Sequence, residues 1–149
     1  MTSHSAPSPA PADLSAYVPM SAMTGFNAYI GTLLRHPGKA AGEAGRFAFV
    51  PGPQHLNGGG ALHGGFLMTI ADNVLGTTVH EATDGRIAST VTLNTDFLAG
   101  GTAGAPVLAT AAITRKTRSL IFVAGELTQG DRVLMTASGI WKIIGIGKK

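Results

Sequence analysis

Cysteine is absent from the 149-residue chain. Its absence excludes disulfides, thiolate metal ligands and a cysteine nucleophile. The N-terminus also lacks a basic start followed by an apolar run, so it does not read as a signal peptide. Nowhere do about 18 consecutive apolar residues occur, which would be needed for a transmembrane helix. We therefore expect a cytoplasmic protein with no membrane partner.

Charged residues are scarce as well. They make up 13% of the chain while hydrophobic residues make up 44%, and the usual charged share is about 25%. With so few charged residues, part of the surface of the folded chain is expected to be apolar. Association with further copies of the chain is the simplest way to bury that surface. The net charge is +3 without a run of Lys and Arg. This balance argues against nucleic acid as a partner and suits a small ligand that bears phosphates.

The chain is long enough for one domain with its own core. Its first 13 residues are rich in Ser, Ala and Pro, a composition typical of segments that do not pack. We expect a flexible tail at 1–19 and a single domain at 20–149.

Hydrophobic periodicity predicts two helices and five strands in this domain. The first helix is expected at about 20–34, and the second at about 64–81, where apolar residues on most sides indicate burial. The strands are expected at 45–50, 87–98, 106–115, 119–128 and 132–144, the last four as a meander. The predicted class is α+β: an antiparallel sheet around one central helix, whose far side a second copy of the chain could cover.

Asp72 is the one ionisable residue in the apolar middle of the second predicted helix. It shares a stripe of small and polar residues with Gly65, Thr69 and Gly76, which lie at helical spacing. A glycine inside a helix costs about 1 kcal/mol relative to Ala, so the stripe indicates that a ligand or a second backbone comes close. Asp72 is either a general base or a structural acceptor of hydrogen bonds, and the helix alone leaves both open.

Five glycines fall among residues 58–65, just before this helix. Amides at a helix N-terminus are unpaired and lie at the positive end of the helix dipole, so they can bind a phosphate or a developing oxyanion. No Lys-Ser/Thr follows, so the loop is not a P-loop. An oxyanion site can polarise the carbonyl of an activated ester, and a carboxylate can activate water. These two groups are the minimum that its hydrolysis requires.

The stretch NGGGALHGG at 57–65, followed by Ile70-Ala71-Asp72, resembles the signature of PaaI-type hotdog thioesterases, relatives of the 4-hydroxybenzoyl-CoA thioesterases. The resemblance extends from about Gly45 to Ile144. It implies the hotdog fold, a curved antiparallel sheet around a long helix. It also implies hydrolysis of an acyl-CoA without metal or cofactor, by homodimers that often pair again as a dimer of dimers, with the active sites at the dimer interface.

The resemblance assigns a role to each matching residue. Asp72 acts as general base or as nucleophile toward the thioester, and the backbone N–H of Gly64 polarises the carbonyl. Asn57 assists the catalytic arrangement, and Thr90 orients the attacking water. In the dimer, Asp72 of one chain would work beside Asn57 and Gly64 of the other. Strict alternation along the 87–98 strand puts Thr90 on the same polar face as Thr92 and Asn94.

Further residues are candidates for substrate binding: His63, Gly65, Arg115, Lys116 and Arg118. His63 is expected mainly to orient the glycine loop, because no G-x-S-x-G elbow supports a catalytic triad. The three basic residues lie at a predicted hairpin turn and are either a solvated turn or a contact for the phosphates of CoA.

Two other functions stay open. The chain could be a non-catalytic acyl-CoA binder or regulatory module, although a pure binder has no need for a buried acid. It could also be a hotdog enoyl-CoA hydratase, in which His80, eight residues after Asp72, would join the carboxylate. The acyl group itself is not indicated. The candidates for lining its pocket are Phe66, Met68, Leu75 and Phe97.

Overall fold

The computed structural model describes residues 12–20, 23–39 and 43–145. Most of the tail predicted at 1–19 lies outside the described residues. The elements follow in the order β1 (Val18–Pro19), α1 (Gly25–Ile30), β2 (Leu34–Arg35), β3 (Gly45–Phe49), a 3₁₀ turn η1 (Pro53–His55), α2 (Gly64–Ala82), β4 (Ile87–Phe97), β5 (Val107–Lys116), β6 (Leu120–Gln129) and β7 (Arg132–Gly145). No helix among these described residues is long and apolar enough to cross a membrane.

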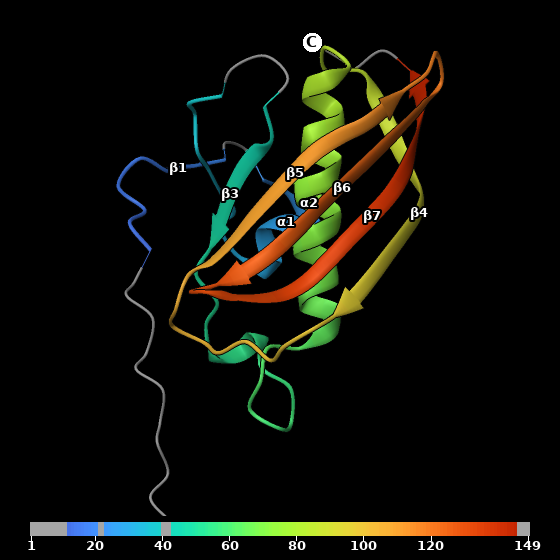
Figure 1. Cartoon of the computed structure of the whole chain (residues 1–149). Helices are drawn as coiled ribbons and strands as arrows, with labels where there is room; N and C mark the ends of the chain where they lie inside the picture. The colour runs from blue at the N-terminus through green and yellow to red at the C-terminus, as the bar shows by residue number, and fades with distance from the viewer. Residues whose placement is uncertain (1–11, 21–22, 40–42, 146–149) are drawn as a thin grey trace, which may run out of the picture.

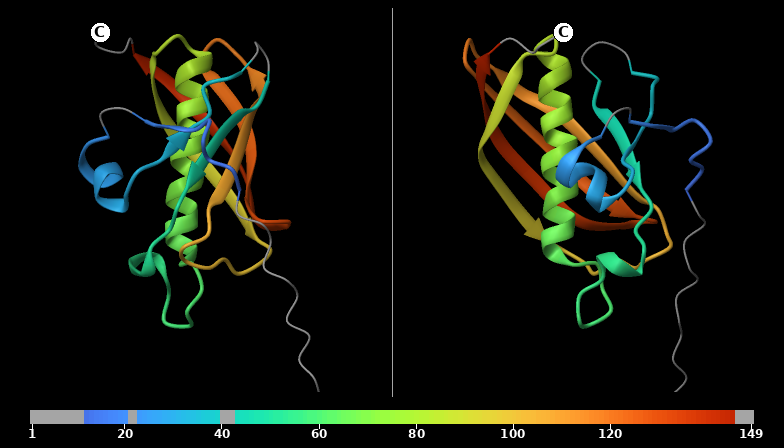
Figure 2. Two further views of the ribbon diagram at one scale, coloured as in Figure 1. Left: turned by 90° about the vertical axis from the view of Figure 1, so that its left-hand side faces the viewer. Right: turned by 180° about the vertical axis from the view of Figure 1, so that it is seen from behind.

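One antiparallel sheet curves around α2, which lies in its concave face (Figures 1 and 2). The predicted α+β class is confirmed. The strand order is β1-β2-β3-β5-β6-β7-β4. The predicted meander of β4 to β7 is therefore wrong for β4, which lies beside β7 and not beside β5. The segment 98–106 is long enough to carry the chain past the end of α2, so β4 and β5 need not pair. β4 pairs with β7 and forms one edge of the sheet.

The first predicted helix is much shorter than expected. It ends at Ile30 because Gly31 adopts a φ of 118°, outside the helical range. The chain then turns so that Leu33 is buried, and Leu34 pairs with Ala48 of β3. The apolar spacing that predicted a helix to residue 34 therefore comes from two different elements.

The long helix α2 buries one side against the inner face of the sheet. The buried side consists of Leu67, Ile70, Ala71, Val74, Leu75, Thr78 and Val79. Burial of each large aliphatic side chain stabilises the fold by about 1.5–3 kcal/mol. At the C-terminal end of α2, Lys116 Nζ donates to the carbonyl oxygen of Ala82 at 2.5 Å, where a cation also complements the helix dipole.

The opposite side of α2 carries the stripe of Gly65, Thr69, Asp72 and Gly76. None of these four residues is buried. The helix therefore has the uncovered side that the sequence led us to expect.

A β-bulge at Val91 decides which way Thr90 points. Thr90 pairs with Trp141 of β7, and the next paired residue, Thr92, faces Ile140, so Val91 is an extra residue in β4. Directly opposed residues share a face of the sheet, and Trp141 is buried on the α2 side. Thr90 therefore points toward α2 while Thr92 points away. The prediction that these two threonines share a face is wrong, because strict alternation takes no account of a bulge.

Candidate functional site

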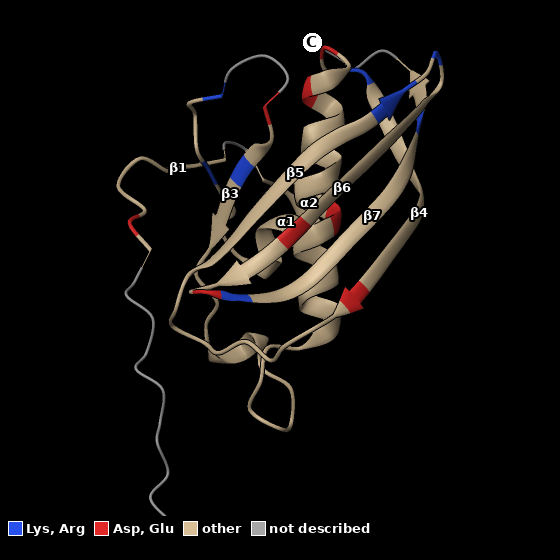
Figure 3. Cartoon of the chain, in the orientation of Figure 1, with Lys and Arg blue, Asp and Glu red and all other residues tan. Residues whose placement is uncertain are grey.

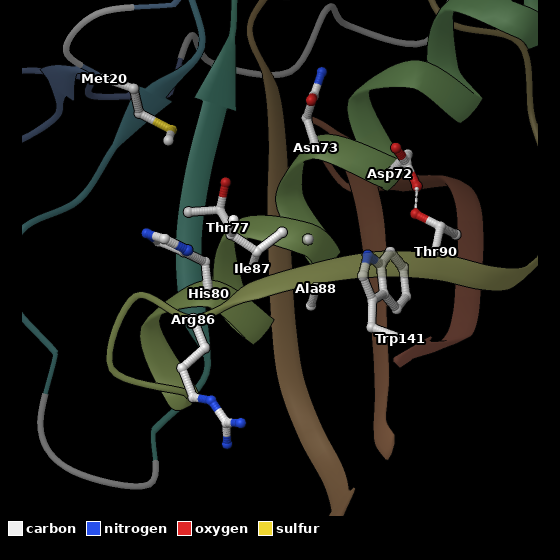
Figure 4. A pocket seen from close by; sticks show the side chains of 11 residues that line it. Met20, Asp72, Asn73, Thr77, His80, Arg86, Ile87, Ala88, Thr90 and Trp141 are labelled. Carbon is white, nitrogen blue, oxygen red and sulfur yellow. Dashed lines mark hydrogen bonds between the residues drawn. The ribbon is translucent and has the colours of Figure 1, made fainter. Parts of the chain in front are cut away.

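Asp72 and Thr90 meet between α2 and β4. Thr90 Oγ1 donates a hydrogen bond of 2.9 Å to Asp72 Oδ1 (Figure 4). Within the described part of the chain, the second carboxylate oxygen has no partner. The carboxylate is thus fixed in orientation by one oxygen and presents the other, as a general base or a nucleophile requires.

A cavity of about 440 Å³ opens beside this pair. Its wall includes residues of α2, the turn after α2, the start of β4 and β7: Asp72, Asn73, Gly76, Thr77, His80, Arg86, Ile87, Ala88, Thr90 and Trp141, with Met20 from the N-terminal segment (Figure 4). Trp141 is only 3% exposed and forms part of the floor. His80 and Arg86 are exposed and lie where the cavity meets solvent.

The N-terminus of α2 leaves the Gly64 amide without a partner among the described residues. His63 caps the helix, because its Nδ1 accepts a hydrogen bond of 2.9 Å from the Gly65 N–H. The His63 N–H donates to the carbonyl oxygen of His55 at 2.8 Å. His63 therefore orients the loop and occupies the Gly65 amide, and the Gly64 amide stays available to a ligand.

Asn57 holds the glycine loop in shape. Its Oδ1 accepts hydrogen bonds from the amides of Gly59 and Ala61, at 2.9 and 3.2 Å. Its side-chain NH₂ has no partner in the described part of the chain, so it can still donate to a carbonyl oxygen of a ligand.

A second cavity of about 490 Å³ lies beside the N-terminal half of α2. Its walls are Phe26, Tyr29, Ile30, Gln54, His55, Leu56, His63, Gly65, Phe66 and Thr69. Phe66 stacks on His55 with ring centroids 4.2 Å apart. Of the residues expected to line an acyl pocket, Phe66 lines this cavity, whereas Leu75 is buried in the core and Met68 and Phe97 are exposed.

Gly64 and Asp72 cannot act on one carbonyl group within a single chain. They are eight residues apart on one helix, which corresponds to about 12 Å along its axis. Reacting and stabilising groups must approach the same centre to about 3 Å. A reaction that uses both groups on one carbonyl therefore requires two copies of the chain.

The predicted basic residues gather at one end of the sheet (Figure 3). Arg115 and Arg118 are exposed and have no partner among the described residues, whereas Lys116 is bound to the end of α2. Arg86 and Lys142 lie at the same end, since Ile87 pairs with Gly145 and Lys142 faces Leu120.

Sequence reasoning missed three features of this site: Arg86, Trp141 and the second cavity. No local pattern marks Arg86, which belongs to the turn after α2. Trp141 comes to the site only through the pairing of β4 with β7, which the sequence did not predict. The aromatic residues of the second cavity come from three separate segments.

Comparison with known proteins identifies the family. The sequence model of the thioesterase superfamily matches residues 59–136, more than half of the chain and the part that contains Gly64, Asp72 and Thr90. This chain belongs to the thioesterase superfamily. Comparison with curated proteins finds no match by sequence.

Solved structures confirm that this superfamily member has a PaaI-like hotdog fold. A phenylacetic acid degradation-related protein of Ralstonia eutropha JMP134 is 26% identical, with a TM-score of 0.73 over 83% of this chain and 92% of that one. The PaaI protein of E. coli is 24% identical, with a TM-score of 0.63 over 70% and 75%. A Bacillus halodurans protein solved with CoA is 25% identical, with a TM-score of 0.61 over 66% of both chains.

The geometry predicts that Thr90→Val lowers turnover of the substrate about 10-fold, because loss of one hydrogen bond to a charged group removes about 1.5 kcal/mol or more and frees Asp72 to rotate. Thr90→Ser keeps the hydroxyl and is expected to retain most of the activity. Steady-state kinetics of both variants test this, with thermal unfolding as the control for folding. Equal activity of the Val and Ser variants would show that the hydroxyl does not serve the carboxylate.

Proposed function

We propose that this protein hydrolyses acyl-CoA thioesters to a free acid and CoA, without a metal ion or cofactor. One observation carries the proposal: Thr90 holds one oxygen of the Asp72 carboxylate, which lies in the wall of a cavity with its other oxygen unpaired among the described residues. Hydrolysis of a thioester needs a base that activates water and a donor that stabilises the oxyanion. The unpaired Asp72 oxygen can be the base, and a free amide at a helix N-terminus can be the donor.

The proposed reaction begins with water beside the free oxygen of Asp72. The carboxylate takes a proton as the water oxygen bonds to the carbonyl carbon, and the Gly64 N–H of a second subunit stabilises the oxyanion. Thr90 Oγ1 donates a hydrogen bond to Asp72 Oδ1 and can accept one hydrogen bond from the same water. The C–S bond then breaks, and the departing thiolate of CoA takes up the proton that Asp72 accepted from the water, which restores the carboxylate.

Direct attack by Asp72 on the carbonyl carbon, to give an acyl anhydride that water then cleaves, uses the same geometry. A single turnover in ¹⁸O-labelled water tests the anhydride route. Label in the Asp72 carboxylate shows that Asp72 is the nucleophile and that water cleaves the anhydride at the Asp72 carbonyl. Label only in the product acid is the result of the general-base route and also of an anhydride cleaved at the acyl carbon, and trapping of an acylated Asp72 distinguishes these two.

A homodimer that pairs two β4 edges supports this chemistry. β4 spans Ile87–Phe97 and has one free edge, and a long uncovered edge readily pairs with another strand. Val91 and Phe97 on this strand are 56% and 52% exposed. Pairing here would also cover the stripe of α2 and bring Gly64 and Asn57 of one subunit toward Asp72 of the other. Assembly of two such dimers stays a prediction.

CoA as the carrier of the acyl group is supported by two independent features. The Bacillus halodurans neighbour was solved with CoA, and five basic residues of this chain gather at one end of the sheet. Arg86 joins that end to the Asp72 cavity, so it is a candidate contact for a phosphate together with Arg115 and Arg118. Lys116 is a weaker candidate because it binds Ala82.

The two rival functions fit the site less well. A pure acyl-CoA binder gives no reason for a carboxylate held with one oxygen free. A hydratase needs an acid and a base close to one double bond, but His80 lies about 12 Å beyond Asp72 along the helix and near solvent. Thiol release, tight binding without thiol release, and loss of enoyl absorbance distinguish the three functions directly.

Asp72→Asn keeps the shape of the side chain and removes its charge, so we expect thiol release from a panel of acyl-CoAs to fall 10²- to 10⁴-fold, roughly the contribution of a general base. Glu81→Gln is the matched control, because Glu81 lies about two and a half turns further along the same helix and pairs with Arg35 outside the cavity. Full turnover by a folded Asp72→Asn variant would rule out the mechanism.

A proline at Gly64 tests the amide directly. Proline has no N–H and is tolerated at the first position of a helix, and the preceding residue His63 already has an extended backbone at φ −64° and ψ 132°. We expect Gly64→Pro to lower kcat by about 10²- to 10³-fold, as loss of one oxyanion donor does.

Gly64→Ala is the control for added bulk at this position. An added Cβ there would meet the Phe97 ring at 3.1 Å in both variants, but only the Ala variant keeps the N–H. Equal activity of the Ala and Pro variants would remove the amide from the mechanism.

A further inference from the structure

His55 is a buried histidine whose two ring nitrogens are both hydrogen-bonded. It belongs to η1, which lies beside the first turn of α2 (Figures 1 and 2), and it is 8% exposed. Its Nδ1 accepts a hydrogen bond of 2.9 Å from the Gly52 N–H, and its Nε2–H donates one of 2.7 Å to the carbonyl oxygen of Ile30 at the end of α1. Because an amide N–H only donates and a carbonyl oxygen only accepts, these bonds select the neutral ring with its proton on Nε2.

Two aromatic rings hold the imidazole between α2 and β3. Phe66, in the first turn of α2, stacks on it with ring centroids 4.2 Å apart, and Phe49 of β3 meets its edge at 5.3 Å. Burial of a polar ring costs free energy unless its nitrogens find partners. An apolar side chain would fill the same space without that requirement, so packing alone does not account for a histidine here.

The backbone of His55 connects this junction to the proposed oxyanion donor. Its carbonyl oxygen accepts a hydrogen bond of 2.8 Å from the His63 N–H. On the other side of the same residue, His63 Nδ1 accepts a bond of 2.9 Å from the Gly65 N–H. The Gly64 N–H belongs to the planar peptide unit between these two anchored points. Its direction therefore depends on where the His55 carbonyl group lies.

The other support of the glycine loop acts farther from this amide. Asn57 bonds the amides of residues 59 and 61, which lie three or more residues before Gly64. Among the described residues, His55 is the one residue outside the start of α2 that hydrogen-bonds His63. His55 is therefore the link that fixes the entry to α2 against the rest of the fold.

We propose that His55 is a positioning residue for thioester hydrolysis, which through His63 aims the Gly64 N–H at the substrate carbonyl. This inference rests on the proposed thioesterase function and adds a residue that acts through another. The bond from His55 to Ile30 makes the end of α1 part of the same support. Such a support matters because misplacing a reacting or stabilising group by about 1 Å can cost about 10²-fold in rate.

Three substitutions separate the ring of His55 from its hydrogen bonds. His55→Phe keeps a stacked ring and loses both ring bonds, so we expect kcat to fall about 10- to 100-fold. KM should stay close to the wild-type value, because the amide acts mainly in the transition state. In His55→Asn the side-chain oxygen can still accept from Gly52, and in His55→Gln the side-chain NH₂ can still donate to Ile30. Each of these two variants should retain more activity than His55→Phe.

A double-mutant cycle with Gly64→Pro tests whether His55 acts through the amide. The proline has no N–H to aim, so adding His55→Phe should leave the remaining kcat of Gly64→Pro unchanged to within about twofold. If His55→Phe does not fold, the Asn and Gln variants take its place in the cycle. Multiplication of the two effects, or wild-type kcat in all folded His55 variants, would overturn the proposal.

His36→Phe is the matched control, because His36 also accepts a backbone N–H, that of Gly38, but lies beside Arg46 of β3. We expect it to keep wild-type kcat. Thermal unfolding of every variant accompanies the kinetics, and a lowered Tm with full kcat would reduce His55 to a stabilising residue and overturn the proposal.

Hydrogen exchange of the free protein measures the support without any turnover. Peptides that cover residues 56–66 should exchange faster in His55→Phe than in the wild type or in His36→Phe, because the His63 and Gly65 amides lose their fixed partners. Unchanged exchange there would contradict the positioning role. Failure of the proposed function would appear separately, as no thiol release by the wild type, and this exchange measurement does not depend on it.

Discussion

The hydrogen bond from Thr90 Oγ1 to Asp72 Oδ1 joins the two elements that enclose the cavity, α2 and the edge strand β4. It exists because Val91 is an extra residue in β4 and the strand is paired with β7 through Trp141. A bulge bends a strand and re-aims a side chain, and here it lets Thr90 face the helix while Thr92 and Asn94 face away. The direction of the Asp72 carboxylate thus depends on one irregularity in the ladder of the sheet.

The same helix supplies both halves of the proposed chemistry. Its first turn offers the free Gly64 amide, and its middle offers the Asp72 carboxylate. Helix rise keeps these groups about 12 Å apart in one chain, so each half needs a second copy. The free β4 edge and the uncovered stripe on α2 lie on the side of the molecule where such a copy would pair. The low charge of the sequence has a physical reason if this surface is an interface.

Much of this could be predicted from the sequence because its signals are local. The 3.6-residue spacing marks α2, and the alternation marks the strands to within about two residues. Asp72 stands out as one charge in an apolar helix, and the glycines of 58–65 mark the helix start. The bulge at Val91, the pairing of β4 with β7, the end of α1 at Gly31 and the approach of Trp141 to Gly76 depend on tertiary contacts, which one sequence does not display.

The central claim is that each site takes Asp72 from one subunit and the Gly64 amide from the other. The most direct measurement co-expresses two variants with separate purification tags, Asp72→Asn and Gly64→Pro, and assays the purified mixed dimers. In a mixed dimer, one of the two sites keeps both wild-type groups. We expect purified mixed dimers to regain about half of the wild-type thiol release per dimer, although each parent variant is nearly inactive. No recovery in stable mixed dimers would contradict the account, because it would place both groups in the same subunit or remove one of them from the reaction.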